Sequence, residues 1–314
     1  MSIRRSHAAV SSAAVVLALV VTGCGGDDTA SASDGPTVLA SFYPLAYVAE
    51  RVAAPDGIVE NLTQPGVEPH DLELTGQQVG SIADADVVLY LHGFQPAVDE
   101  AVEQNADDHS LDVAETVDLL PATEEESHED EDGDRDDHGD LEGDPHVWLD
   151  PANLAAIAQT VADELAEIVP DRADALQDRA DELVAELNAL DEEFESGLAQ
   201  CERRVFVTSH EAFGYLADRY DLEQVGISGL SPDAEPSPAR LAEVQEVVQA
   251  EGVTTIFYET LVSPKVAETM AEDLDLATAV LDPIEGLTDE TADEDYVTLM
   301  RANLDALRKA NGCS

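Results

Sequence analysis

The sequence predicts an α/β protein of two lobes, each built on a mostly parallel sheet flanked by helices. Three observations indicate this fold. Short apolar runs of strand length alternate with amphipathic runs of helix length before residue 150 and again after residue 200. Between them, apolar residues recur every three or four positions over residues 173–199, as one helical face requires. The chain, at 314 residues, is also long enough to form two hydrophobic cores.

In the first half, the predicted strands are short runs rich in valine, leucine and isoleucine, at residues 37–42, 58–62 and 86–91. The predicted helices cover residues 44–53 and 74–83, and Pro44 suits a first helical turn. The loop after the second predicted strand contains the run Gly66-Val67-Glu68-Pro69-His70-Asp71.

The middle of the chain is predicted to be a helical linker over residues 151–200. A first apolar stripe runs from Leu154 to Ile168, and Pro170 interrupts it. The second stripe predicts a helix over residues 173–199, about 40 Å long at 1.5 Å per residue. A helix of that length would join the two lobes as a spine.

The second half repeats the alternation of the first. Predicted strands cover residues 204–208, 224–227, 254–258 and 277–281, and predicted helices cover residues 209–220, 238–250, 264–274 and 296–309. We therefore expect an N-terminal lobe over residues 37–150 and a C-terminal lobe over residues 201–314.

The N-terminus has the pattern of an export signal. Two arginines precede a short apolar run, and Val21-Thr22-Gly23-Cys24 resembles the lipobox of bacterial lipoproteins, in which the cysteine is acylated. We expect a signal peptide over residues 1–23, lipidation of Cys24 and a flexible tether over residues 24–36. The alternative is an ordinary secretory signal with an incidental cysteine. With an anchor of this kind the protein would face the extracytoplasmic side of the cell membrane.

The remaining cysteines, Cys201 and Cys313, are expected to form a disulfide, because disulfides persist outside the cytoplasm. Such a bridge would stabilise the fold by about 3–4 kcal/mol on the loop-entropy model. The alternative is two free thiols.

The formal charge of −55 makes nucleic acid and anionic lipid surfaces poor partners, because both require a basic footprint. Residues 124–144 hold thirteen carboxylates and one arginine, yet acidic residues are in excess throughout the chain. We interpret the even spread as a surface adapted to salt or solubility. The acidic loop over residues 122–144 is either a weak cation collector, with His128 and His138, or a solvated insertion without a specific role.

Four side chains are candidate metal ligands. Ligands in open α/β sheets bind at the carboxyl ends of strands, where His70, His210 and Asp282 are predicted to lie. His146 is held between two prolines at the connection between the lobes. Three imidazoles and one carboxylate form the ligand set of a tetrahedral zinc site, which would lie in the cleft between the lobes. Each residue alone also has a structural explanation, as a surface loop, a helix cap or a turn former.

The sequence resembles the metal-binding lipoproteins of bacterial ABC uptake systems, the zinc/manganese (cluster A-I) solute-binding family. The similarity covers residues 37 onward, and four stretches carry it: Gly66 to Asp71, Asp144 to Pro151, Thr208 to Leu216 and Leu281-Asp282-Pro283. The resemblance implies that His70, His146, His210 and Asp282 bind the metal. Manganese-type members have a glutamate where His210 stands, so the third histidine favours the zinc-binding subfamily. A register shift of one residue would instead place Glu211 at the site.

By the same resemblance, the protein is expected to bind Zn²⁺ with high affinity outside the cell and to deliver it, as a monomer, to the permease and ATPase of an ABC transporter. It is not expected to be an enzyme. The alternatives are a manganese-binding homologue, an adhesin in which the metal is structural, and a zinc hydrolase with Asp282 as its base. Asp150 and Glu259 are candidates for orienting a ligand's far ring nitrogen. Otherwise Asp150 is a helix cap and Glu259 an exposed charge at a strand end.

Overall fold

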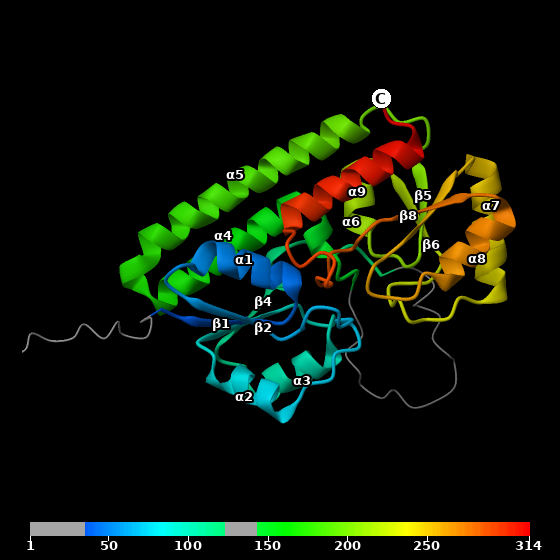
Figure 1. Ribbon diagram of the computed structural model, residues 1–314. Coiled ribbons are helices and arrows are strands. Elements are labelled where there is room, and N and C mark those ends of the chain that lie inside the picture. Colours follow the sequence, from blue (N-terminus) through cyan, green and yellow to red (C-terminus); the bar gives the residue numbers. More distant parts are fainter. Residues whose placement is uncertain (1–34, 123–142) are drawn as a thin grey trace, which may run out of the picture. The chain divides into compact units, whose positions relative to one another are not determined.

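The structure is a computed structural model that describes residues 35–122 and 143–314. The predicted signal peptide, Cys24, most of the tether and nearly all of the acidic loop lie outside the described residues. Figure 1 shows the chain as a ribbon coloured from the N-terminus in blue to the C-terminus in red. By their internal contacts, residues 33–314 group together as one unit.

The first lobe contains a four-stranded sheet in the order β2-β1-β3-β4, and every neighbouring pair in it is parallel. Its strands are β1 (Thr37–Ala40), β2 (Ile58–Asn61), β3 (Val87–Tyr90) and β4 (Ser110–Asp112). The helices α1 (Tyr43–Ala53), α2 (Gly76–Asp84) and α3 (Pro96–Asn105) connect them. The prediction missed α3 and β4, whose sequences have little apolar periodicity.

The second lobe repeats this topology. Its sheet has the order β6-β5-β7-β8, again parallel throughout, formed by β5 (Val205–Thr208), β6 (Glu223–Gly226), β7 (Thr255–Tyr258) and β8 (Ala277–Val280). The helices of this half are α6 (Gly214–Arg219), α7 (Pro238–Glu251), α8 (Lys265–Leu274) and α9 (Tyr296–Asn311). Two sheets with the same strand order confirm the predicted two-lobed parallel architecture.

Alternate residues of the central strands pack on opposite faces of each sheet, as the two-residue period of a strand requires. In β3, Val87 and Leu89 join the large core that spans both lobes, whereas Val88 faces α2 and α3. In β5, Phe206 joins the large core, whereas Val207 belongs to the cluster under α7 and α8. Burial on both faces explains why these strands are continuous hydrophobic runs in the sequence.

The linker forms two packed helices, α4 (Pro151–Ile168) and α5 (Ala173–Leu198), separated by a short turn at Pro170–Arg172. The long helix predicted over residues 173–199 is therefore confirmed. In Figure 1, α5 runs beside α4 and reaches α9, the red helix near the C-terminus. Its inward face is the predicted stripe, and every member is buried: Leu176, Ala180, Leu183, Leu187, Leu190, Phe194 and Leu198.

A disulfide joins Cys201 and Cys313, as predicted, and links the end of α5 to the end of α9. None of the helices within the described ranges is both long and apolar enough to cross a bilayer.

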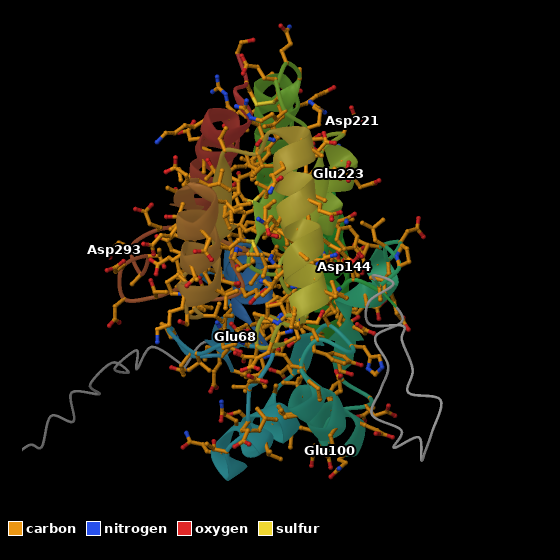
Figure 2. The ribbon with its side chains drawn as sticks, turned by 90° about the vertical axis from the view of Figure 1, so that its right-hand side faces the viewer. Glu68, Glu100, Asp144, Asp221, Glu223 and Asp293 are labelled. Carbon is orange, nitrogen blue, oxygen red and sulfur yellow. A yellow bond between two sulfur atoms is a disulfide. The ribbon has the colours of Figure 1, made fainter. Side chains whose placement is uncertain are left out.

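Acidic side chains occur in both lobes rather than in one patch. Figure 2 labels Glu100 in α3, Glu223 in β6 and Asp293 before α9, and these three project on different sides of the molecule in that view. Glu68 and Asp144 lie between them, close to where the two lobes meet.

Candidate metal centre

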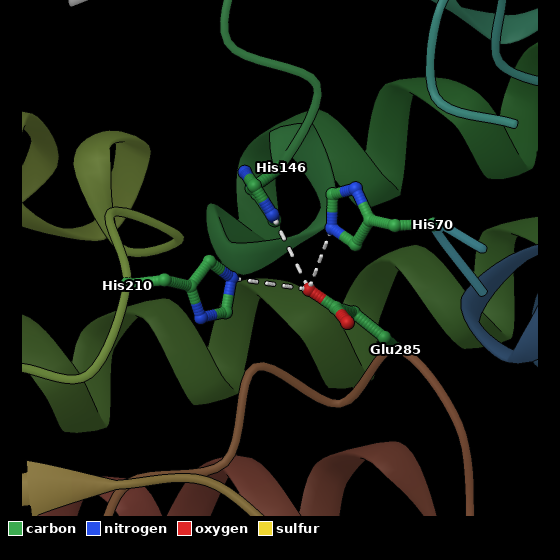
Figure 3. A group of neighbouring side chains, drawn as sticks. All are labelled: His70, His146, His210 and Glu285. Carbon is green, nitrogen blue, oxygen red and sulfur yellow. Dashed lines mark ion pairs between the residues drawn. The ribbon is translucent and has the colours of Figure 1, made fainter. Parts of the chain in front are cut away.

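Three histidines and one glutamate from four separate segments meet between the lobes (Figure 3). Each of His70, His146, His210 and Glu285 offers one ligand atom, and these four atoms lie within 4.8 Å of one another. His146, His210 and Glu285 are almost fully buried, and the His70 side chain is 11 % exposed.

His70 comes from the loop between β2 and α2. Gly66 allows this loop to turn, because its φ of 80° lies in the left-handed region that favours glycine. The Gly66 N–H donates to the Leu287 carbonyl at 2.7 Å, so the loop is tied to the segment that carries Glu285. The Pro69 carbonyl, one residue before His70, accepts a hydrogen bond from the buried Gln95 side chain.

His146 precedes a 3₁₀ turn at Val147–Leu149, which leads into α4. The Asp144 carboxylate accepts a hydrogen bond from the backbone N–H of His146 at 2.9 Å and lies 2.8 Å from the Nδ1 atom of its ring. With Nδ1 held in this way, Nε2 is the nitrogen that faces the centre.

His210 follows β5, and its ring is held by the same arrangement. The Glu259 carboxylate lies 2.8 Å from its Nδ1 atom and also accepts a hydrogen bond from the Ser209 hydroxyl at 2.7 Å. Glu259 is 3 % exposed, so it is a buried partner of His210 and not the exposed charge of the alternative interpretation. Glu211 points elsewhere and pairs with Arg240 at 2.8 Å, so His210 is the residue of this pair that faces the centre.

Glu285 supplies the carboxylate at the centre. Its Oε1 atom lies 3.5, 3.2 and 3.5 Å from the Nε2 atoms of His70, His146 and His210. Four ligands at 2.0–2.1 Å around a tetrahedral zinc ion would be about 3.3 Å apart. Among the described residues, the three Nε2 atoms and both Glu285 oxygens are buried without a hydrogen-bond partner. Buried polar atoms of this kind need a partner, and a divalent cation would satisfy all four groups.

The electrostatics of the centre are set by the three imidazoles and the carboxylates beside them. Burial lowers the pKa of His210, but the charges of Glu259 and Glu285 outweigh burial and raise it to about 10. Burial likewise opposes charging of His146, and its carboxylate neighbours again raise its pKa. Burial alone would raise the pKa of Glu285, but the three imidazoles hold it well below its usual value. The buried carboxylates therefore favour positive charge at the centre, and a divalent cation would supply it.

Aromatic rings close one side of the centre. The Phe94 ring lies 4.5 Å from the His70 ring, and Trp148 lies 5.3 Å from the His146 ring, measured between centroids. Both aromatic side chains are buried. A water-poor wall strengthens the interaction between a bound cation and its ligands.

A family model described as the zinc-uptake complex component A, periplasmic (ZnuA), matches residues 38–310. The chain belongs to this family.

Relatives of known name support the family assignment. The zinc-binding lipoprotein AdcA of Streptococcus pneumoniae serotype 4 is 36 % identical over 303 residues, covering 94 % of this chain and 59 % of its own length. The high-affinity zinc uptake system protein ZnuA of Bacillus subtilis is 34 % identical over 302 residues, covering 92 % of this chain and 93 % of its own. The chain thus spans less than two thirds of AdcA but almost the whole of the Bacillus protein.

Solved structures of relatives have the same fold. The Zn(II)-bound ZnuA-like domain of Streptococcus pneumoniae AdcA is 33 % identical, with a TM-score of 0.73, covering 88 % of this chain and 99 % of that one. The laminin-binding protein Lmb of Streptococcus agalactiae, described as bifunctional with adhesin and metal transporting activity, is 28 % identical with a TM-score of 0.77. It covers 88 % of this chain and 99 % of its own.

Within this ZnuA-family fold, the predicted carboxylate and the observed one differ. The prediction placed Asp282 at the centre, but the group of neighbouring donors found among the described residues contains Glu285 instead. The Asp282 carboxylate accepts hydrogen bonds from the Ile284 N–H at 2.8 Å and from the Thr260 hydroxyl at 2.9 Å. Asp282 therefore stabilises the turn after β8, and this turn directs Glu285 inward.

The turn that presents Glu285 is strained. Ile284 adopts φ 58°, a conformation that β-branched residues rarely take and that costs about 1–3 kcal/mol. Hydrogen bonds from neighbouring side chains stabilise the turn and offset this cost. The Trp148 indole donates to the Pro283 carbonyl at 2.7 Å. The Asn303 amide accepts from the Asp282 N–H and donates to the Asp282 carbonyl. Glu285 was missed because the prediction expected the ligand directly after the strand. The available signal was the one acid in the run 283–287, whose other members are proline, isoleucine, glycine and leucine.

Of the other carboxylates near the centre, Asp144 orients a histidine and Asp150 does not. Asp150 caps α4, since its carboxylate accepts from the Ala152 N–H at 2.8 Å, and this matches the alternative interpretation of that residue. Asp144, which the prediction did not single out, orients His146 in the way that Glu259 orients His210. Asp144 is the last of thirteen carboxylates in residues 124–144, so the sequence alone gives no reason to single it out.

Proposed function

We propose that this protein captures Zn²⁺ outside the cytoplasm and delivers it to the permease and ATPase of an ABC transporter. His70, His146, His210 and Glu285 are the proposed ligands, with Glu285 in place of Asp282. The observation that carries the proposal is the convergence of three Nε2 atoms and one carboxylate oxygen, all buried and without hydrogen-bond partners among the described residues.

The donor set favours zinc over manganese. Imidazole nitrogen suits zinc, whereas manganese prefers carboxylate and water oxygen. Four protein donors fill a tetrahedral site and leave no position for an activated water, so the site suits binding and not hydrolysis. The names of the relatives, which are zinc-binding and zinc-uptake proteins, point the same way.

The proposal extends to how the protein is held and organised. The lipobox at Cys24 would anchor it to the extracytoplasmic face of the cell membrane, with residues 24–36 as tether. Residues 37–150, 151–200 and 201–314 would act as N-terminal lobe, linker and C-terminal lobe of a monomer. The acidic loop 122–144 would collect cations near the cleft. Similarity to Lmb makes adhesion a second candidate function, with the metal in a structural role.

Replacement of the two competing carboxylates tests the ligand assignment. Glu285→Gln should weaken zinc binding by more than the roughly 10–100-fold that loss of an outer partner costs, because it removes a ligand and the charge that balances the ion. Asp282→Asn retains the shape of the turn and should weaken binding less. Competition against a chromogenic chelator measures both. If Asp282→Asn lowered the zinc affinity more than Glu285→Gln did, Asp282 would be restored as the fourth ligand.

The identity of the metal is tested on protein purified without added metal. Native mass spectrometry should find zinc at one equivalent, and deletion of the gene should impair growth in chelated medium until zinc is restored. Manganese as the bound metal would contradict the zinc assignment. Growth unaffected by deletion, together with lost surface binding, would favour adhesion.

A further inference from the structure

The hydroxyl of Tyr215 in α6 joins two segments that are distant in sequence. It accepts a hydrogen bond from the Leu120 N–H at 2.9 Å and donates one to the Asp144 carbonyl at 2.7 Å. The Asp144 N–H in turn donates to the Leu120 carbonyl at 2.8 Å. Leu120 and Asp144 stand on either side of residues 123–142, which are outside the described residues. Three hydrogen bonds thus fix Asp144 relative to α6.

Close packing restricts Asp144 further. A Cβ atom added to Gly214, the first residue of α6, would lie 2.5 Å from the Oδ2 atom of Asp144. A Cβ atom added to Gly143 would lie 2.5 Å from the Leu120 carbonyl oxygen. The backbone of Gly214 therefore approaches the Asp144 carboxylate, and the backbone of Gly143 approaches Leu120, at positions where only glycine leaves room. Asp144 is 4 % exposed and Tyr215 is 5 % exposed.

The other side of the Asp144 carboxylate holds His146. The Oδ1 atom of Asp144 accepts a hydrogen bond from the backbone N–H of His146 at 2.9 Å and lies 2.8 Å from the Nδ1 atom of its ring. A rotation of this carboxylate would break both hydrogen bonds and release the imidazole from its orientation. The orientation of His146 therefore depends on how firmly Asp144 is held, and Tyr215 holds it from the second lobe.

We propose that Tyr215 is a positioning residue for the metal centre: its bridging hydroxyl holds Asp144 against His146 and so directs the Nε2 atom of His146 toward the ion. This role rests on the proposed function of the centre. It also connects the two lobes, because the segment that supplies His210 continues into the helix that positions His146. Burial and the nearby Asp144 raise the pKa of Tyr215, so the hydroxyl keeps its proton and donates.

The test is a double-mutant cycle between Tyr215→Phe and Asp144→Asn. Asp144→Asn should weaken zinc binding by about 10–100-fold, the usual cost of removing a ligand's hydrogen-bond partner. Tyr215→Phe should weaken it by about 3–10-fold, since it loosens that partner without removing it. If Tyr215 acts through Asp144, the double variant should be no weaker than Asp144→Asn alone.

Tyr220→Phe is the matched control. Tyr220 follows α6, is also buried, and donates its hydroxyl proton to Asp191 at 2.9 Å, away from the centre. Both tyrosine variants should lower the unfolding temperature of the metal-free protein by similar amounts, but only Tyr215→Phe should weaken zinc binding. Equal zinc affinity in the two variants would overturn the proposal, and so would strictly additive losses in the cycle.

A second readout does not depend on zinc. In metal-free protein, ¹⁵N NMR of the imidazoles should show the His146 Nδ1 proton hydrogen-bonded to Asp144, and Tyr215→Phe should shift the resonance of that Nδ1–H group as the hydrogen bond weakens, while the His210 signals are unchanged. If wild-type protein bound zinc poorly but this shift appeared, the proposed function would fail and the positioning role would stand. An unchanged His146 ring would reject the positioning role.

Gly214→Ala tests the same contact with the hydroxyl intact. Its methyl group would displace the Asp144 carboxylate, and both the zinc affinity and the His146 signal should change in the direction seen for Tyr215→Phe. If Tyr215→Phe does not fold, Gly214→Ala still tests whether the position of Asp144 controls the orientation of His146. Wild-type behaviour of Gly214→Ala would count against the proposal.

Discussion

The three imidazoles of the centre are not held equally. His146 and His210 each present Nε2 inward because a buried carboxylate occupies Nδ1, that of Asp144 in one case and of Glu259 in the other. For His70 the structure shows no such carboxylate among the described residues, and its loop is the element that fixes it. Orientation of two rings before the ion arrives reduces the ordering cost of binding.

The raised pKa values of His146 and His210 predict that zinc binding releases protons. A raised pKa means that the metal-free imidazole retains its proton to higher pH, for His210 to about 10. Because the ion requires neutral imidazoles, binding near pH 7.5 should release about one to two protons, and affinity should rise from about pH 6 to about pH 9. Calorimetry in buffers of different ionisation enthalpy measures the released protons. A binding enthalpy that is the same in every buffer would refute this prediction.

At the scale of elements, the segment after β5 shows how tertiary contacts override local pattern. The sequence predicts a helix over residues 209–220, but α6 begins at Gly214. The backbone of residues 209–211 bonds instead to the neighbouring loop, through Glu211 N–H to the Gly229 carbonyl and Ser228 N–H to the Ser209 carbonyl. These bonds replace a first helical turn and keep His210 facing the centre.

Removal of the disulfide between Cys201 and Cys313 should destabilise the fold and leave the zinc affinity unchanged. The disulfide closes a loop of 112 residues, for which the loop-entropy model gives about 5 kcal/mol. The double variant Cys201→Ser/Cys313→Ser should lose about that much free energy of unfolding in urea. It should bind zinc as wild type does, because the bridge joins the ends of α5 and α9 and touches none of the four proposed ligands. A loss below about 1 kcal/mol would mean that the loop-entropy model does not apply here.

For the whole molecule, the dominant physical quantity is a formal charge of −55. Several of the 14 basic residues are already used in ion pairs that join different elements. Examples are Arg51–Glu186, Arg219–Asp191 and Arg301–Glu193, at 2.7, 2.7 and 2.8 Å. Many more carboxylates must therefore rely on solvent cations for charge balance.

This imbalance predicts that salt stabilises the metal-free protein. Raising KCl from about 0.1 M to about 1 M shortens the screening length from about 10 Å to about 3 Å, so repulsion between surface carboxylates weakens. The unfolding temperature should rise by about 5 °C or more, which corresponds to roughly 3 kcal/mol for a chain of this size. Thermal unfolding across a KCl series measures it, with sucrose as the uncharged control. An unfolding temperature independent of KCl would remove the salt-adaptation hypothesis.

Much of this protein follows from its sequence alone. The strand and helix periods, the long linker helix and the short motifs around the three histidines are local features, and parallel topology places the strand ends near His70 and His210 together. Tertiary structure decided the rest. It placed Glu285, and not Asp282, beside the three imidazoles, because a strained turn at Ile284 directs the chain inward three residues later than expected. It also selected Asp144 and Glu259 among many carboxylates, because only burial beside an imidazole distinguishes them, and burial is a property of the packed chain.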